Sequence, residues 1–240
     1  MNEKIIPITK HETEHIVAIL DLLGASETIT SERSEAVLNA IFEIFNKAQS
    51  TWPFLGNAPA VLHEIKCVTF SDNIALALDL SGLSDHEDAV RSFIKYISVF
   101  QGAAFKNGFL FRGGIAMGSL YMDPKANFVW GKALVDAHIL EEKTAIYPRV
   151  VLSYQFNKYD LSRIPRIRQD FDGLYFVDYV PTINKLYPSW IEKNKHLIKE
   201  QYITRKEKTA QERILQKYGW LQHYIEQCEE NNIKAEEPIT

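Results

Sequence analysis

The spacing of apolar and polar positions predicts a chain of alternating strands and helices. Short β-branched apolar runs are typical of strands, whereas apolar positions about three to four apart are typical of helices. Strands are predicted over 15–20, 63–70, 74–80, 109–117, 149–153 and 174–179, with residues 118–121 leaving the fourth of them. Helices are predicted from a capping segment at 30–33 through about 48, over 86–107 and over 132–146. The order β–α–β–β–α–β, followed by α–β, predicts an α+β, ferredoxin-like fold with an antiparallel sheet and helices on one face.

The C-terminal part of the chain has a different character. Residues from about 187 to 230 are rich in Lys, Glu and Gln, and their apolar positions predict two helices with a break near Ile203-Thr204. We therefore divide the chain into a polar tail at 1–14, a main domain at 15–182 and a helical extension at 183–240.

A polar interruption at Ser71-Asp72-Asn73, between two apolar strands, predicts a β-hairpin with a carboxylate at its tip. A second carboxylate, Asp21, directly follows the apolar run 16–20. If the two strands are neighbours, the carboxylates converge and repel each other unless a cation lies between them. Hard oxygen ligands at an open site favour Mg²⁺ or Mn²⁺ carrying phosphate. The alternative is that each Asp caps the turn after its strand.

Composition narrows the possible functions. The chain has 240 residues, of which 46% are hydrophobic and 24% charged, as in an ordinary globular protein. A net charge of -4 argues against a broad nucleic-acid surface. The two cysteines, Cys67 and Cys228, exclude a disulfide framework or a Cys-rich metal site. The polar N-terminus lacks the pattern of a signal peptide, and no apolar run approaches the ~20 residues needed for membrane insertion, so we expect a cytoplasmic protein.

Four segments together resemble the class III nucleotidyl cyclases, the family of adenylate and guanylate cyclases. They are Leu20–Gly24, Phe70–Asn73, Arg112–Gly118 and Trp130–Ala137, and the resemblance covers about residues 15–155. It implies that the main domain is a catalytic domain that binds two Mg²⁺ or Mn²⁺ ions per site. By that resemblance the metal ligands are Asp21, Asp72 and the backbone carbonyl of Leu22.

Further side chains are candidates for contacts with a nucleotide. The amide groups of Leu23 and Gly24 are expected to face phosphate, and Lys132 is a weaker phosphate candidate. Arg112 is either a catalytic phosphate contact or part of a structural ion pair. Arg149 is expected either on the surface or at a phosphate across a dimer.

The expected base pocket lies along the strand before the hairpin tip. Lys66, Val68 and Phe70 alternate with Asp72, so that all of them can face one side of the sheet, although packing in the core is the alternative.

The chain departs from purine cyclases at four positions. Val135 and Ile139 occupy the positions of the family's Asn and Arg, four residues apart on the helix after Trp-Gly. Val68 and Phe128 occupy the positions of its purine-selecting polar residues. An apolar side chain cannot hydrogen-bond to a purine edge, so selectivity for ATP or GTP is not expected.

One branch of the family matches more of the chain, namely the pyrimidine nucleotide cyclases of bacterial Pycsar antiphage systems. Additional matching segments are 147–150, 172–179 and 217–221. This resemblance implies a homodimer that converts UTP or CTP to cyclic UMP or cyclic CMP, with UTP favoured, and a separate effector that the product activates. The alternatives are an adenylate or guanylate cyclase with unusual selectivity, and a catalytically inactive module that binds nucleotide. Retention of both Asp21 and Asp72 favours an active enzyme.

Overall fold

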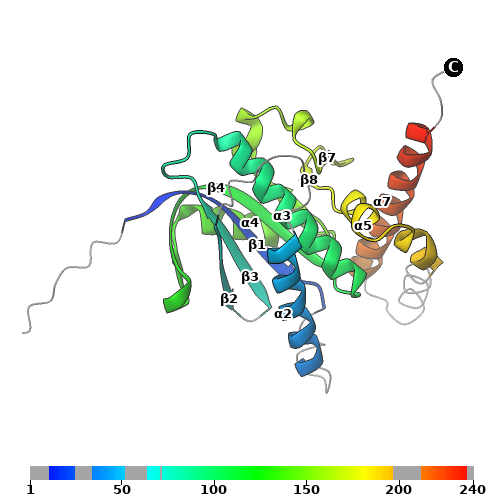
Figure 1. Cartoon of the computed structure of the whole chain (residues 1–240), viewed down its shortest axis with the longest axis horizontal. Coiled ribbons are helices and arrows are strands. Elements are labelled where there is room, and N and C mark those ends of the chain that lie inside the picture. The colour runs from blue at the N-terminus through cyan, green and yellow to red at the C-terminus, as the bar shows by residue number, and fades with distance from the viewer. Residues whose placement is uncertain (1–10, 25–33, 52–63, 71, 197–211, 237–240) are drawn as a thin grey trace, which may run out of the picture.

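The structure, a computed structural model, describes residues 11–24, 34–51, 64–70, 72–196 and 212–236. A central sheet carries helices on both faces, and α5 and α7 gather at one end (Figure 1). The strands are β1 (Thr13–Leu22), β2 (Ile65–Phe70), β3 (Asn73–Asp79), β4 (Phe111–Asp123), β5 (Phe128–Trp130), β6 (Val150–Leu152), β7 (Ile167–Gln169) and β8 (Tyr175–Val177). The α-helices are α2 (Ser34–Thr51), α3 (His86–Lys106), α4 (Lys132–Lys143), α5 (Val180–Leu186) and α7 (Glu212–Glu236), with a helical segment at 190–196. Short 3-10 turns are η2 (Pro124–Ala126), η3 (Tyr154–Lys158) and η4 (Leu161–Arg163).

The first part of the sheet has the predicted ferredoxin-like arrangement. The full strand order is β2-β3-β1-β4-β6-β8-β7, and the first four strands in this order pair in an antiparallel manner. Together with α2 after β1 and α3 after β3, this arrangement confirms the predicted β–α–β–β–α–β order. The hairpin of β2 and β3 therefore lies directly beside β1, as the convergence of the two acidic segments requires.

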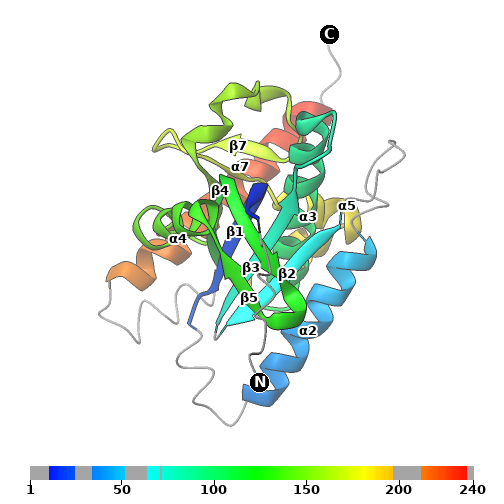
Figure 2. The same ribbon diagram turned by 90° about the vertical axis from the view of Figure 1, so that its left-hand side faces the viewer.

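The two faces of the sheet pack against different helices. Ile16, Ala18 and Leu20 of β1 belong to the core cluster that includes α3, whereas Val17 and Ile19 pack with residues of α4. Successive side chains of a strand point to opposite faces, so α3 and α4 lie on opposite sides of the sheet (Figure 2). The prediction of helices on one face holds for α2 and α3 and is wrong for α4. Because both faces are covered, β1 is continuously apolar from Ile16 to Leu20.

The sheet extends further than the sequence pattern predicts. β4 continues through 118–121, where the strand was predicted to end, and pairs with β5 from Tyr121 to Asp123. β6 lies parallel to β4, so the complete sheet is mixed rather than antiparallel. The strands β5 and β7 were not predicted, because 128–130 was assigned to the segment that leads into the helix at 132, and β7 contains one apolar residue in three.

The ends of α3 follow the predicted capping chemistry. The Asp85 side chain accepts a hydrogen bond from the Asp88 amide at 2.9 Å, and Gly108 follows the helix with a φ of 83°. The predicted caps at 30–33, the hairpin residue Ser71 and the predicted break near 203–204 lie outside the described residues. Among the helices of the described residues, none is both long enough and apolar enough to cross a membrane.

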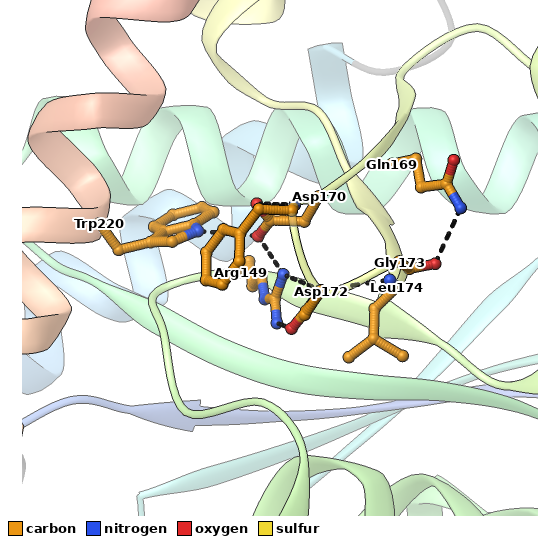
Figure 3. Close-up of polar contacts among 8 residues, drawn as sticks. Arg149, Gln169, Asp170, Asp172, Gly173, Leu174 and Trp220 are labelled. Atoms are coloured by element: carbon orange, nitrogen blue, oxygen red, sulfur yellow. Dashed lines mark hydrogen bonds and ion pairs between the residues drawn. The ribbon is translucent and has the colours of Figure 1, made fainter.

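A buried ion cluster joins the end of the sheet to α7. The Arg149 side chain is 1% exposed and pairs with both Asp170 and Asp172, in the turn between β7 and β8 (Figure 3). The Trp220 indole of α7 donates a hydrogen bond to Asp170 Oδ2 at 2.8 Å. The expectation that Arg149 lies on the surface or contacts phosphate is therefore wrong, since its guanidinium is buried among carboxylates. The Arg149 carbonyl accepts from the Gly113 amide at 3.1 Å, which connects this cluster to β4.

Candidate active site

The structure brings the two acidic segments together at the ends of β1 and the hairpin. Asp21 lies opposite Asn73 in the β1–β3 register, and the Leu22 amide donates to the Asp72 carbonyl at 3.4 Å. This proximity was predicted from the apolar runs on either side of the two acids. The site therefore forms where β1 ends, beside the turn between β2 and β3.

On the other side of β1, Asp21 lies opposite Arg112 of β4. Arg112 Nε donates to Asp21 Oδ2 at 2.7 Å, and Arg112 Nη2 lies 2.7 Å from Glu141 Oε1 of α4. Of the two roles considered for Arg112, the structure displays the ion pair. One guanidinium thus holds two carboxylates from different elements.

Glu141 is a residue that the sequence interpretation missed. It lies in a run of charged residues at the end of α4, where a solvated side chain is the usual expectation, yet it is 3% exposed. Burial raises the pKa of its carboxyl group, Arg112 opposes the shift and the charge of Asp21 adds to it. The only signal in the sequence is its position four residues beyond Ala137 and eight beyond Ala133, on the buried face of the helix.

The donor set at this site fits a hard divalent cation in kind. Asp21, Asp72 and the Leu22 carbonyl offer oxygen atoms, which Mg²⁺ and Mn²⁺ prefer, and phosphate oxygens of a substrate would complete the coordination. Within the described ranges, no group of three or more His, Cys, Asp or Glu side chains is arranged to hold a metal ion. The Asp21 carboxylate is paired with Arg112, so a cation must compete with this guanidinium.

The base-pocket candidates share the face of the sheet on which Asp21 lies. In the register, Phe70 lies opposite Asn73, which in turn lies opposite Asp21, and Lys66 and Val68 follow at alternate positions. Val68 is buried in the cluster between the sheet and α4, so its observed role is packing. Phe70 is exposed and Lys66 is half-buried. Of these three candidates for the base pocket, Phe70 therefore lies nearest the hairpin tip.

The structure gives less support to the three residues expected to contact phosphate, which are Leu23, Gly24 and Lys132. The Leu23 amide donates to the Leu110 carbonyl at 2.9 Å and is therefore already engaged. Gly24 has a φ of 81°, a conformation suited to glycine in a tight turn. Lys132 pairs with Asp136 one helical turn further along α4, and its side chain is 67% exposed.

Exposed apolar side chains lie on α4 and β5. Val135 and Ile139 of α4 are 54% and 43% exposed, and Phe128 and Trp130 of β5 are exposed as well. We call these four residues the apolar patch. An exposed set of this kind is typical of a surface that binds another protein.

The fold can be compared with known proteins. No protein-family model matches the sequence, and no curated protein matches it. Among solved structures, the chain is similar to the adenylyl cyclase CyaB from P. aeruginosa, with 15% identity and a TM-score of 0.46 over 71% of this chain and 96% of that one. It is similar to a guanylyl cyclase, with 16% identity and a TM-score of 0.45 over 70% of this chain and 93% of that one. A class III adenylyl cyclase-like ATP-binding protein from Pseudomonas aeruginosa matches with 11% identity and a TM-score of 0.40 over 60% of this chain and 34% of that one.

Proposed function

We propose that this protein is a metal-dependent nucleotidyl cyclase that converts a pyrimidine nucleoside triphosphate to its 3′,5′-cyclic monophosphate and pyrophosphate. The observation that carries the proposal is the meeting of the Asp21 and Asp72 segments at the ends of adjacent central strands, next to Arg112. Folding alone does not require two acidic segments at this point. Binding of a triphosphate together with divalent cations does require carboxylates there.

Each of the three charged residues has a role in this proposal. The carboxylates of Asp21 and Asp72 would hold two Mg²⁺ or Mn²⁺ ions, with the Leu22 carbonyl as a further ligand. Ions held there would supply Lewis acidity toward the ribose 3′ oxygen and positive charge opposite the leaving pyrophosphate. Arg112, released from Asp21, supplies positive charge near the phosphates as the 3′ oxygen bonds to the α-phosphorus.

The preference for a pyrimidine rests on the side chains near the hairpin. Val68 is packed in the core and Phe128 is apolar, so neither position can hydrogen-bond to a purine edge. Lys66 can only donate, which favours the O4 of uracil over the amino group of cytosine. We therefore expect UTP as the preferred substrate, CTP as the next and cyclic UMP as the main product.

We further propose that the enzyme works as a homodimer in antiphage defence. The exposed apolar patch on α4 and β5 is a surface to which a second subunit can pack, and the patch of one subunit would then complete the site of the other. The resemblance to the Pycsar cyclases then implies that the cyclic nucleotide activates a separate effector protein.

The test is incubation with ATP, GTP, CTP and UTP, each with Mn²⁺, followed by identification of the products by mass spectrometry. We expect mainly cyclic UMP, and its loss in Asp72→Asn serves as the control for a contaminating enzyme. Mainly cyclic AMP or cyclic GMP would refute the pyrimidine assignment and support the alternative of a purine cyclase.

One observation favours a second candidate function, a catalytically inactive module that binds nucleotide. Arg112 already neutralises Asp21, and a permanent pair of this kind would keep cations away from the carboxylate. Binding of a nucleoside triphosphate without any cyclic product, at saturating Mn²⁺, would support this candidate.

A further inference from the structure

Glu141 reaches the site because the end of α4 lies unusually close to β4. A Cβ atom at Gly114 would lie 2.4 Å from the Ala137 carbonyl oxygen and 2.6 Å from Leu140 Cβ. Only glycine therefore allows the last turns of α4 to rest on this strand. Arg112, two residues earlier on the same strand, points to the same face and meets Glu141 there.

The contacts of Arg112 are divided between two acids. Its Nε donates to Asp21 Oδ2 at 2.7 Å, its Nη2 lies 2.7 Å from Glu141 Oε1, and its Nη1 donates to the Glu141 carbonyl at 3.4 Å. Glu141 Oε2 also lies 3.3 Å from His138 Nδ1. Two carboxylates around one guanidinium leave an excess negative charge. One carboxylate would be enough for an ion pair that only attaches α4 to β4.

From this arrangement we infer that Glu141 is a positioning residue, which retains Arg112 at the site when Asp21 exchanges the guanidinium for a divalent cation. The inference rests on the proposed function, because it assigns a cation to Asp21. The physical reason is that a partly buried guanidinium is costly to leave without a partner. With Glu141 present, the Arg112 guanidinium can donate two hydrogen bonds to the Glu141 carboxylate when Asp21 binds the cation.

Removal of the Glu141 charge should therefore weaken cation binding at Asp21, although Glu141 is not itself a ligand of the cation. In Glu141→Gln, Arg112 has Asp21 as its remaining carboxylate among those named, so a cation must break this pair without a second negative charge to hold the guanidinium. We expect Mn²⁺ to bind about tenfold more weakly than to the wild type. The matched control is Glu142→Gln, which removes the same charge from the exposed neighbour on the same helix and should leave Mn²⁺ affinity within about twofold.

The experiment is titration of the full chain with Mn²⁺ alone, followed by electron paramagnetic resonance of the free ion. It needs neither substrate nor turnover. Equal Mn²⁺ affinity in folded Glu141→Gln and in the wild type would overturn the inference while leaving the proposed function intact. A wild-type protein that binds no Mn²⁺ would overturn both. Glu141→Asp keeps the charge and should restore most of the affinity.

A measurement on the wild type decides the matter even if Glu141→Gln fails to fold. The Arg112 Nε–H resonance, assigned by its absence in Arg112→Lys, is followed during titration with Mg²⁺. We expect its chemical shift to change as Asp21 is released, while its exchange with water stays slow because Glu141 still holds the side chain. Exchange as fast as that of the exposed Arg163 after Mg²⁺ binding would show that Glu141 does not retain Arg112.

Discussion

Replacement of Arg149 by Met should destabilise the protein strongly, because it leaves two carboxylates without their cation. Breaking a buried ion pair from one side costs about 3–5 kcal/mol. The Asp170 side chain is 12% exposed and should bear most of this cost, whereas that of Asp172 is 31% exposed and is partly relieved by water. Lost stacking of the guanidinium on Tyr147 and Trp220 adds to the loss, and burial of the Met side chain offsets part of it. We expect a net loss of about 3 kcal/mol in the free energy of unfolding.

The assay is urea denaturation followed by circular dichroism, so that a change in Trp220 fluorescence does not distort the comparison. The matched control is Arg163→Met, which removes an arginine that is 81% exposed and paired with Asp160, and should cost less than about 1 kcal/mol. If Arg149→Met and Arg163→Met unfold at the same urea concentration with the same slope, the ion cluster does not stabilise the fold and our reasoning about it fails.

Three further predictions concern the acidic site, the apolar patch and the two cysteines. Asp21→Asn and Asp72→Asn should each reduce cyclase turnover below about 1% of wild type while circular dichroism stays unchanged, and wild-type turnover of either variant at saturating Mn²⁺ would exclude the metal role. Ile139→Glu should weaken the proposed dimer at least about tenfold in sedimentation equilibrium and lower activity on dilution, since it places a charge in the apolar patch; association equal to that of the wild type would refute an interface at this patch. Burial raises the pKa of Cys67 and Cys228 from an ordinary value of 9.0 to about 12, so both thiols should react slowly with a thiol reagent at pH 8 until urea unfolds the chain. Since these thiols deprotonate more easily in the unfolded chain, stability should fall as the pH rises from 9.0 toward 12, and a flat profile there would contradict their burial.

The central elements could be predicted from the sequence because their signals are long and local. β1 and β3 contain the continuous apolar runs 16–20 and 74–78, and α3 has a regular apolar face with caps at both ends. Those same runs place Asp21 and Asp72 at strand ends. The proximity of the two acids thus follows from strand order, once β1 is taken to lie beside the hairpin.

Other features depend on contacts between distant residues and leave no periodic signal. The position of α4 on the second face is permitted by the missing side chain of Gly114, which reads in the sequence as one glycine among several. Burial of Glu141 and Arg149 follows from partners 29 and 21 residues away, so their charge alone predicts a solvated surface. The engaged amide of Leu23 was likewise hidden, because its acceptor Leu110 lies on a distant part of the chain.

The attachment of α7 has a consequence for the order in which the molecule forms during synthesis. The Tyr224 hydroxyl donates to Asp178 at 2.5 Å and accepts from the Tyr179 amide at 2.9 Å, and the same helix covers Val151 and Phe176 of the sheet. Strands β6 and β8 therefore have an open apolar side until residue 228 has left the ribosome. During that interval the nascent chain exposes this apolar surface. A stalled or shortened product should therefore aggregate or bind chaperones instead of remaining stably and partly folded.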